Sequence, residues 1–547
     1  MNKVASLILS FALLLPALAG CGGSPAANTG NSAQGQAQTE KGTASANLEV
    51  VFNAKSEPPS LDPVKSTDIQ SFWIINHMFE GLYWKDQKGE PVLAAAKEVK
   101  ISEDGKTYTF ILQDEGKWSN GDPVTSEDFV YSFLQHLNPK VGSTTAYRLY
   151  YIKGAEEFNK GTGKMENVGV KAVDAKTLEI NLVVPTSFFP KLLATQYYVP
   201  IHKKTAEANP NWAADASSYV TNGPYKMTSW KHDSEIVIEK NEHYWNQQDV
   251  SMQKVTWKMV SDATTYYQMF KGGQLDVVSD LTADILASEK QNPGLETKSL
   301  FGTYMYLFNV SKPPFTNQKV RQAFALAIDR KLITEAVTRA GEIPAYAMVP
   351  PGASTPSGGD FRAEKPEYVT YNPEEAKRLL EEGMKEEGWT TFPETTLLYN
   401  TSDANKQVAQ VVQEMIKKNL GVDLRLENQE LKMQLANLKQ KNYQMARGSW
   451  TPAVDDPVFS LDRYSGDAAG DTAWVNDEYV KLKAAATVEP DANKRNAMLH
   501  QAEDMLMNDM PFIPVYFPSQ NYLVQPGLKG LSYPLGLYPI ARWATRE

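Results

Sequence analysis

The sequence predicts an α/β protein in which mixed sheets are covered by helices and divided between two lobes. Strand-like and helix-like patterns alternate along most of the 547 residues without an internal repeat. One stretch predicts a complete β-α-β unit, with a strand at 397–399, a helix at 406–420 that ends at Gly421, and a strand at 422–426. A chain of this length also exceeds what one hydrophobic core usually organises. These observations favour two lobes.

The first folded element is predicted at residues 48–52, a short apolar strand. Two further strands with alternating apolar residues are predicted at 106–112 and 177–183. Between them, Thr125 is expected to cap a helix, because Asp128 occupies its third helical position and apolar residues follow.

The second half of the chain carries further helix signals. Residues 320–337 predict one long helix with an apolar face. Asn372 and Pro373, followed by two glutamates, predict the start of another helix, since Asn caps, Pro suits the first turn and acids favour it. Asn222 and Gly223 precede a proline and predict a turn with a positive φ at one of them.

The N-terminal residues carry signals for export. Lys3 precedes an apolar run at 4–15, which fits the h-region of a signal peptide and is shorter than the ~20 residues needed to span a bilayer. Small residues then lead to Cys21, the only cysteine of the chain. A lone cysteine cannot form an intramolecular disulfide, and this one stands where lipidation requires it. The pattern resembles the lipobox of bacterial lipoproteins.

Residues 22–47 are rich in Gly, Ser, Ala, Asn, Gln and Thr, and too poor in large apolar residues to form a core. The sequence therefore predicts a signal peptide at 1–20 and a lipidated Cys21 with a flexible tether at 21–47. The protein is expected at the extracytoplasmic face of the bacterial cell membrane, held there by its lipid.

Composition narrows the classes of partner. The net charge is −10 and no basic stripe is visible, which argues against nucleic acid. The hydrophobic fraction of 42% and the charged fraction of 22% are typical of a globular body. No second apolar stretch approaches spanning length. The 11 Trp and 26 Tyr residues suit both a core and a site for a large polar ligand.

Motifs for catalysis are missing from the sequence. The six His residues form no HExxH pair, and no G-x-S-x-G elbow occurs. Residues 161–165 resemble a phosphate loop only faintly, because Phe158 and Met165 replace its first Gly and its Mg²⁺-binding hydroxyl. No carboxylate pair is singled out. We therefore expect a binding protein without catalytic residues, metal or cofactor, with a surface hydrolase using scattered carboxylates as the distant alternative.

Several motifs, in order, resemble the extracytoplasmic solute-binding proteins of peptide ABC importers, and the oligopeptide-binding branch most. Together they span about residues 48 to 547. The matching segments are residues 56–63, 118–129, 221–227, 314–330, 343–351, 444–450 and 509–516.

The resemblance implies a type II periplasmic-binding-protein-like fold, with two α/β lobes joined by crossing strands, an extra α/β domain and a ligand enclosed between the lobes. The domains expected from it are lobe I (48–68, 186–298 and 512–547), the extra domain II (69–185) and lobe III (299–511). It also implies a peptide ligand, partner permease and ATPase subunits, and a monomeric receptor that catalyses nothing.

The resemblance further implies the site residues. Ser449, Trp450 and Thr451 would form the strand that pairs with the ligand backbone, with Trp450 as a pocket wall, and the segment from Glu57 to Pro59 would face that strand. Arg447 corresponds to an arginine that meets a peptide carboxylate. The pocket-lining aromatics expected from the family are Tyr131, Tyr304 and Tyr306.

Two positions depart from the oligopeptide-binding pattern. Ala453 stands where relatives carry the Asp that anchors the peptide α-ammonium, and Leu431 stands where they often carry a pocket Trp. Three hypotheses follow. Asp455 or Asp456 takes over the ammonium; the ligand lacks a free α-amine there, being blocked, cyclic, longer or not a peptide; or the site serves a sensing or chaperone-like role with weak ligand binding. Relatives that carry nickel chelates or sugars keep a non-peptide solute open, and a pheromone receptor is a further possibility.

Overall fold

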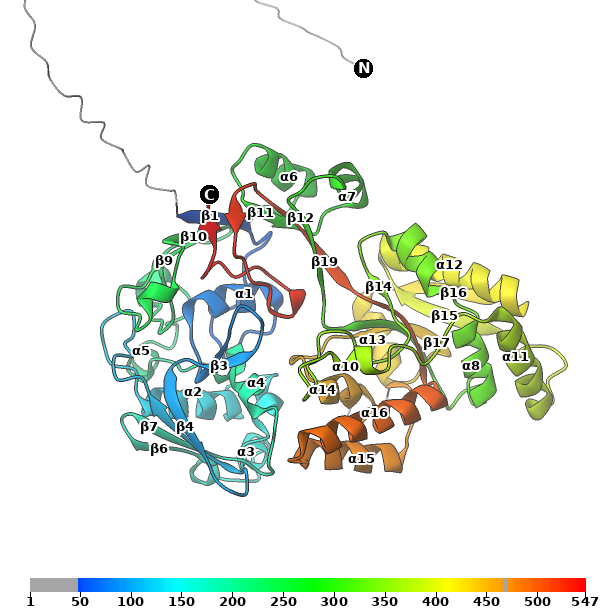
Figure 1. The fold of residues 1–547 in the computed structure, drawn as a ribbon, viewed down its shortest axis with the longest axis horizontal. Coiled ribbons are helices and arrows are strands. Elements are labelled where there is room, and N and C mark those ends of the chain that lie inside the picture. The colour runs from blue at the N-terminus through cyan, green and yellow to red at the C-terminus, as the bar shows by residue number, and fades with distance from the viewer. Residues whose placement is uncertain (1–47, 466–470) are drawn as a thin grey trace, which may run out of the picture. The chain divides into compact units, whose positions relative to one another are not determined.

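The computed structural model describes residues 48–465 and 471–547. Cys21 and the predicted signal peptide and tether lie outside the described residues. Two large sheets organise the body (Figure 1). The seven-stranded sheet has the order β12-β19-β11-β1-β10-β9-β8 and the six-stranded sheet the order β14-β18-β13-β17-β15-β16.

The strands of the seven-stranded sheet are β12 (Leu295–Ser299), β19 (Ser519–Val524), β11 (Val277–Ser279), β1 (Glu49–Asn53), β10 (Lys254–Lys258), β9 (Glu235–Lys240) and β8 (Tyr225–Lys231). Those of the six-stranded sheet are β14 (Ile343–Pro344), β18 (Phe512–Phe517), β13 (Thr303–Phe308), β17 (Met445–Trp450), β15 (Thr395–Asn400) and β16 (Leu424–Gln429). Both sheets mix parallel and antiparallel pairs.

A four-stranded antiparallel sheet forms the centre of domain II. Its order is β4 (Ala96–Ile101), β5 (Thr107–Leu112), β7 (Thr177–Asn181) and β6 (Val170–Asp174). Two antiparallel two-stranded sheets complete the strands: β2 (Tyr83–Lys85) with β3 (Pro91–Leu93), and β20 (Leu528–Lys529) with β21 (Thr545–Arg546).

The helices pack against these sheets in groups. Domain II and the seven-stranded sheet carry α1 (Ile69–Met78), α2 (Ser126–Leu137), α3 (Ala155–Asn159), α4 (Phe189–Leu193), α5 (Lys203–Ala208), α6 (Ala263–Lys271) and α7 (Ala283–Glu289). Around the six-stranded sheet lie α8 (Gln318–Leu326), α9 (Arg330–Leu332), α10 (Phe361–Glu364), α11 (Pro373–Glu387), α12 (Asp403–Leu420), α13 (Leu431–Lys439), α14 (Pro457–Leu461), α15 (Asp477–Val488) and α16 (Ala492–Asp509).

Two chain segments connect the large sheets. The chain leaves the seven-stranded sheet at the end of β12 and enters the six-stranded sheet at β13; it returns from β18 to β19. Figure 1 shows β19 running from one sheet toward the other. These crossings are the connection that the family resemblance implied. In the described part of the chain no helix is long and apolar enough to cross a membrane.

Most local predictions are confirmed. The strands at 48–52, 106–112 and 177–183 appear as β1, β5 and β7. Thr125 and Asp128 form a capping box at the start of α2. The β-α-β unit appears as β15, α12 and β16, and Gly421 ends α12 with a φ of 71°. Asn372 caps α11, its side chain accepting from the Glu375 amide.

The long helix predicted at 320–337 is wrong, because the chain breaks after α8. Asp329 has an extended backbone and caps a new turn, accepting a hydrogen bond from the Leu332 amide at 3.0 Å. The buried Arg330 guanidinium donates to the carbonyls of Ala325 and Ile328, both at 3.1 Å. These carbonyls at the end of α8 are thus satisfied by a side chain instead of by a continuing helix.

The positive φ expected at Asn222 or Gly223 is also wrong. Neither residue has one. The Asn222 side chain instead bonds both backbone groups of Glu80, at 3.0 and 2.8 Å. A Cβ on Gly223 would lie 2.6 Å from the Met78 carbonyl oxygen, so glycine is required by close packing and not by its backbone angle.

Strand pairing and helix packing differ from the expected lobe bounds at two places. Strand β18 pairs with β13 in the six-stranded sheet, whereas the expected bounds place residues 512–517 in lobe I. Helix α1, expected in domain II, packs on the seven-stranded sheet, where Trp73 contacts Phe52 and Trp257 at ring distances of 5.0 and 5.9 Å.

Candidate functional site

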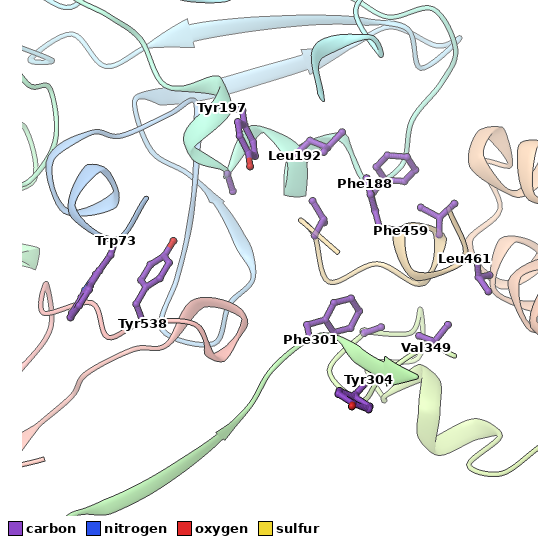
Figure 2. Close-up of a cluster of buried hydrophobic side chains, with 14 of the residues drawn as sticks. Trp73, Phe188, Leu192, Tyr197, Phe301, Tyr304, Val349, Phe459, Leu461 and Tyr538 are labelled. Carbon is purple, nitrogen blue, oxygen red and sulfur yellow. The ribbon is translucent and has the colours of Figure 1, made fainter. Parts of the chain in front are cut away.

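A cavity of about 790 Å³ is lined by residues from both lobes and domain II. This volume is within the range of ligand pockets, roughly 300–1,000 Å³. Domain II and the neighbouring chain contribute Trp84, Lys85, Arg148 and Tyr197; the C-terminal chain contributes Tyr533, Tyr538 and Trp543; lobe III contributes Phe301, Thr451, Pro452, Ala453 and Asp455. Figure 2 shows Tyr197, Phe301 and Tyr538 on three different segments of the chain. The wall is thus aromatic with a few charged groups.

Strand β17 ends at this cavity and leaves part of one edge open. It pairs with β13 along its whole length, but β15 pairs only with Met445 and Ala446. Among the described residues no strand covers the second edge of residues 448–450. Ser449 and Thr451 are exposed there. An extended ligand could therefore add to this edge by backbone hydrogen bonds.

The register separates the predicted site residues into two faces. Ser449 lies opposite Tyr304 and Arg447 opposite Tyr306, whereas Trp450 lies opposite Thr303. Because side chains alternate along a strand, Trp450 points away from the face that carries Arg447 and Ser449.

Trp450 is held by lobe III itself. Its Nε1 donates to the Phe459 carbonyl at 2.7 Å, and the Arg463 guanidinium lies 5.5 Å from its ring centroid. Trp450 does not line the cavity of 790 Å³, whereas the next residue, Thr451, does. These contacts make Trp450 a support for the end of β17.

Arg447 covers a stack of tyrosines. Its Cζ lies 4.8 Å from the centroid of the Tyr304 ring, which stacks on Tyr516 at 4.4 Å. Burial raises the pKa of Tyr304, although the cationic Arg447 opposes this shift. Among the described residues no carboxylate pairs with Arg447; its guanidinium hydrogen-bonds the Tyr304 side chain, and its buried Nε has no hydrogen-bond partner. Tyr306 is fully buried beside them and does not reach the cavity.

The two aspartates after β17 have different partners. The Asp455 carboxylate lies between two lysines, 3.4 Å from Lys85 Nζ and 3.7 Å from Lys191 Nζ. Asp456 is buried, caps α14 and forms a two-pronged ion pair with Arg495 at 3.0 and 2.7 Å. Asp456 is therefore committed to lobe III. Asp455 reaches the cavity, but with an excess of neighbouring positive charge.

Of the expected site residues only Thr451, Ala453 and Asp455 line this cavity, so Arg447, Ser449 and Tyr304 do not, and neither do those described next. The Glu57 carboxylate accepts from Trp230 and His232 side chains, both at 2.8 Å, and so belongs to a polar network of lobe I. Pro59 is exposed, and Leu431 is 49% exposed at the start of α13. Tyr131 is half-buried on α2.

The wall carries charged and aromatic residues that were not predicted, among them Lys85, Arg148 and Tyr197, and Lys191 reaches Asp455 from outside the wall. No motif marks them, because they come from separate segments of the chain and meet the site only through the fold. The dense aromatic stretch around Arg148 was the one available signal. In the described ranges no group of three or more His, Cys, Asp or Glu side chains could hold a metal ion.

Comparison with known proteins agrees with this architecture. A family model described as bacterial extracellular solute-binding proteins, family 5, matches residues 90–472. The oligopeptide-binding protein OppA of Bacillus subtilis is 39% identical over 543 residues, covering 97% of both chains. The dipeptide-binding protein DppE of the same organism is 38% identical over 545 residues, covering 98% of this chain and 97% of its own.

A solved structure supports the fold. The periplasmic murein tripeptide-binding protein MppA in its unliganded open form superposes with a TM-score of 0.79 at 32% identity. The match covers 92% of this chain and 98% of that one.

Proposed function

The chain belongs to the bacterial extracellular solute-binding proteins of family 5, and from this premise we propose that it captures oligopeptides for an ABC importer. The relatives named for oligopeptide, dipeptide and murein tripeptide binding support a peptide as the ligand. The observation that carries the proposal is the open edge of β17 beside the cavity. Backbone pairing at such an edge is indifferent to side chains, so it suits a receptor for many sequences.

In this proposal Ser449 and Thr451 lie along the bound backbone, and Arg447 receives a carboxylate of the ligand. An unpaired guanidinium with a fixed fork of donors matches a carboxylate in shape and charge. The aromatic wall supplies apolar area with polar tips, and water fills what a given side chain leaves open. No step of covalent chemistry is involved.

The proposal also includes a lipid anchor at Cys21 and delivery of the ligand to a permease driven by separate ATPase subunits. The sequence around Cys21 supports the anchor, and the family supports the partners. The receptor acts as a monomer on the outer side of the cell membrane.

A second candidate is a receptor of the same fold for a modified peptide, a pheromone or a non-peptide solute. It is favoured by the surroundings of Ala453. Asp456 is bound by Arg495, and Asp455 by Lys85 and Lys191, so neither offers an unshared carboxylate to an α-ammonium. Leaving such a charge buried without a partner would cost several kcal/mol.

Native mass spectrometry of the purified protein, followed by denaturation to release its ligand, tests both candidates. A ladder of co-purified peptides with free N-termini is expected for an oligopeptide receptor. A single defined compound supports the second candidate. A protein that arrives empty and ignores a peptide library would overturn the peptide assignment.

A further inference from the structure

The arginines of the described chain fall into two groups according to their partners. Seven of the nine that are buried or half-buried bond carboxylates or backbone carbonyls: Arg321, Arg330, Arg362, Arg463, Arg495, Arg542 and Arg546. Arg148 and Arg447 have neither kind of partner there, and both cover tyrosine rings instead. Arg447 is the family's carboxylate contact by resemblance; Arg148 has no such precedent.

Arg148 lines the cavity from the domain II side. Its Cζ lies 4.9 Å from the Tyr147 ring centroid and 5.4 Å from that of Tyr197. Its Nε is buried and has no hydrogen-bond partner within the described residues. A half-buried guanidinium that contacts two rings keeps its orientation, and no carboxylate or backbone carbonyl of the described residues occupies it, so it can receive an anion.

The charges around the cavity also favour an anionic ligand. Lys85, Lys88 and Arg148 line it against the two carboxylates of Asp86 and Asp455. A further lysine, Lys191, approaches Asp455 from behind this wall at 3.7 Å. The cavity is therefore locally positive in a chain whose net charge is −10. Ala453, at a position where an aspartate would offset this excess, leaves it uncompensated.

We propose that Arg148 forms an anion-binding subsite on the domain II wall, so that the receptor prefers acidic peptides over neutral or basic peptides of equal length. The inference rests on the proposed peptide function and specifies its substrate class. A ligand carboxylate next to Arg148 would gain a charge-assisted hydrogen bond in a partly dehydrated place, where such bonds are strongest. A lysine side chain at the same place would meet Arg148 with like charge.

The test uses matched alanine tetrapeptides that carry Glu or Gln at each position in turn, measured by calorimetry on the full-length protein. Glu and Gln have nearly the same shape, so their affinity ratio reports charge. At one position we expect the Glu peptide to bind roughly tenfold tighter than its Gln partner, the size of one hydrogen bond to a charged group. In Arg148→Gln this ratio should fall to about 1, and Arg148→Lys should restore part of it.

Arg425→Gln is the matched control, because Arg425 is exposed on β16 and distant in the fold from the cavity wall. A merely structural role of Arg148 would weaken all peptides alike and leave the Glu/Gln ratio unchanged. Equal affinities for every Glu/Gln pair in the wild type would overturn the subsite while peptide binding stands. A ratio that persists in Arg148→Gln would overturn the role of Arg148. Binding of none of the tetrapeptides would count against the proposed function itself.

Discussion

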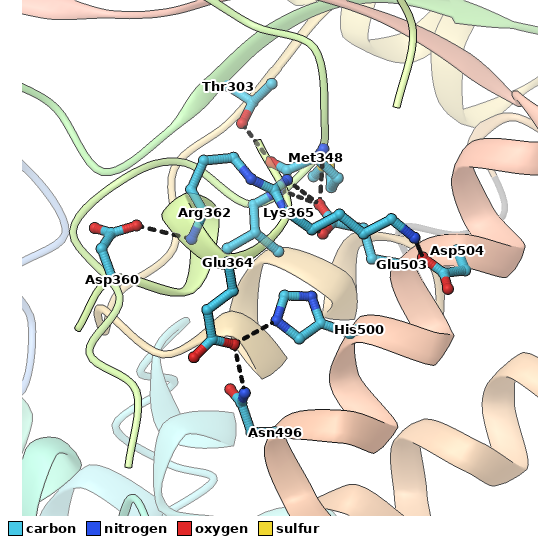
Figure 3. Close-up of polar contacts among 11 residues, drawn as sticks. Thr303, Met348, Asp360, Arg362, Glu364, Lys365, Asn496, His500, Glu503 and Asp504 are labelled. Atoms are coloured by element: carbon cyan, nitrogen blue, oxygen red, sulfur yellow. Dashed lines mark hydrogen bonds and ion pairs between the residues drawn. The ribbon is translucent and has the colours of Figure 1, made fainter. Parts of the chain in front are cut away.

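Arg362 and Arg148 occupy opposite situations in the same molecule. Arg362 is buried in lobe III and grips Glu503 with both terminal nitrogens, at 2.9 and 2.7 Å, while Glu503 also accepts the amides of Met348 and Val349 (Figure 3). Arg148 stands at the cavity with tyrosine rings as its neighbours and no carboxylate.

This comparison distinguishes a charge that stabilises the fold, Arg362, from one that is free to bind a ligand, Arg148. Burial raises the pKa of Glu503, and Arg362 opposes the shift, so the pair holds its charges only by mutual contact and donated amides. A group whose hydrogen-bonding capacity is used up within the fold can stabilise it but cannot select a ligand. A guanidinium that lines a cavity, and that no carboxylate or carbonyl of the fold occupies, can select a ligand.

The largest expected effect is on the structural side of this comparison. Arg362→Ala leaves Glu503 buried without its partner and should lower the free energy of unfolding by about 3–5 kcal/mol. Urea denaturation at pH 7 measures it. The control is Lys365→Ala, which removes a half-exposed pair with Asp504 and should cost no more than about 1 kcal/mol. Similar losses in the two variants would contradict the distinction.

The next largest effect concerns ligand binding. Arg447→Ala should weaken the binding of a peptide with a free C-terminal carboxylate by about 10- to 100-fold, which corresponds to the roughly 1.5–3 kcal/mol of a hydrogen bond to a charged group. The same peptide with an amidated C-terminus should be affected little. Calorimetry on both peptides decides the matter, since unchanged affinity for the free acid would remove Arg447 from the site.

The pH dependence of stability tests His77, a buried histidine whose hydrogen-bond partners favour its neutral form. Burial lowers the pKa of His77 to about 4, although its contact with the Trp73 carbonyl opposes the shift; its Nε2 accepts from the Ala541 amide at 3.1 Å. The unfolded chain therefore binds more protons than the folded one between the ordinary pKa of about 6.5 and this lowered value, and stability falls as pH falls.

Between pH 7 and pH 5 the neutral His77 should lower the free energy of unfolding by about 2 kcal/mol, because pH 5 lies about 1.5 pH units below the ordinary pKa and still above the lowered one. Burial lowers the pKa of His136 to about 4 as well, so it adds to the slope. Denaturation midpoints across this range measure the trend. His77→Gln should flatten part of it, and a midpoint insensitive to pH would refute the assignment.

The smallest expected effect concerns Ala453, which lines the cavity beside the Asp455 cluster. Ala453→Asp should improve binding of short peptides with free N-termini up to about tenfold, since it adds a carboxylate for the ammonium. Ala453→Asn has nearly the same shape without the charge, and N-acetylated peptides lack the ammonium. If Ala453→Asn gave the same gain in affinity, or if N-acetylated peptides gained as much, charge pairing with the ammonium would not be the cause of the gain.

Much of the fold follows from local sequence. The Thr125–Asp128 capping box, the Asn372 cap and the Gly421 helix end are each decided within a few residues, so their elements were predictable. The helix break at Asp329 was not, because it depends on Arg330 reaching carbonyls that also include Pro514, far away in the chain.

The candidate site was likewise predictable only in part. The motifs around Trp450 identified the end of β17 from sequence, and the cavity does lie there. The tertiary structure alone decided that Trp450 bonds the Phe459 carbonyl, that Asp456 pairs with Arg495 and that Asp455 pairs with Lys85. Sequence by itself determined the α/β class, the caps, the export signal as a prediction and the family resemblance, because these depend on patterns and spacings along the chain. Which charges are already paired, and which face the cavity unpaired, depends on contacts between residues hundreds of positions apart, and only the folded chain brings those together.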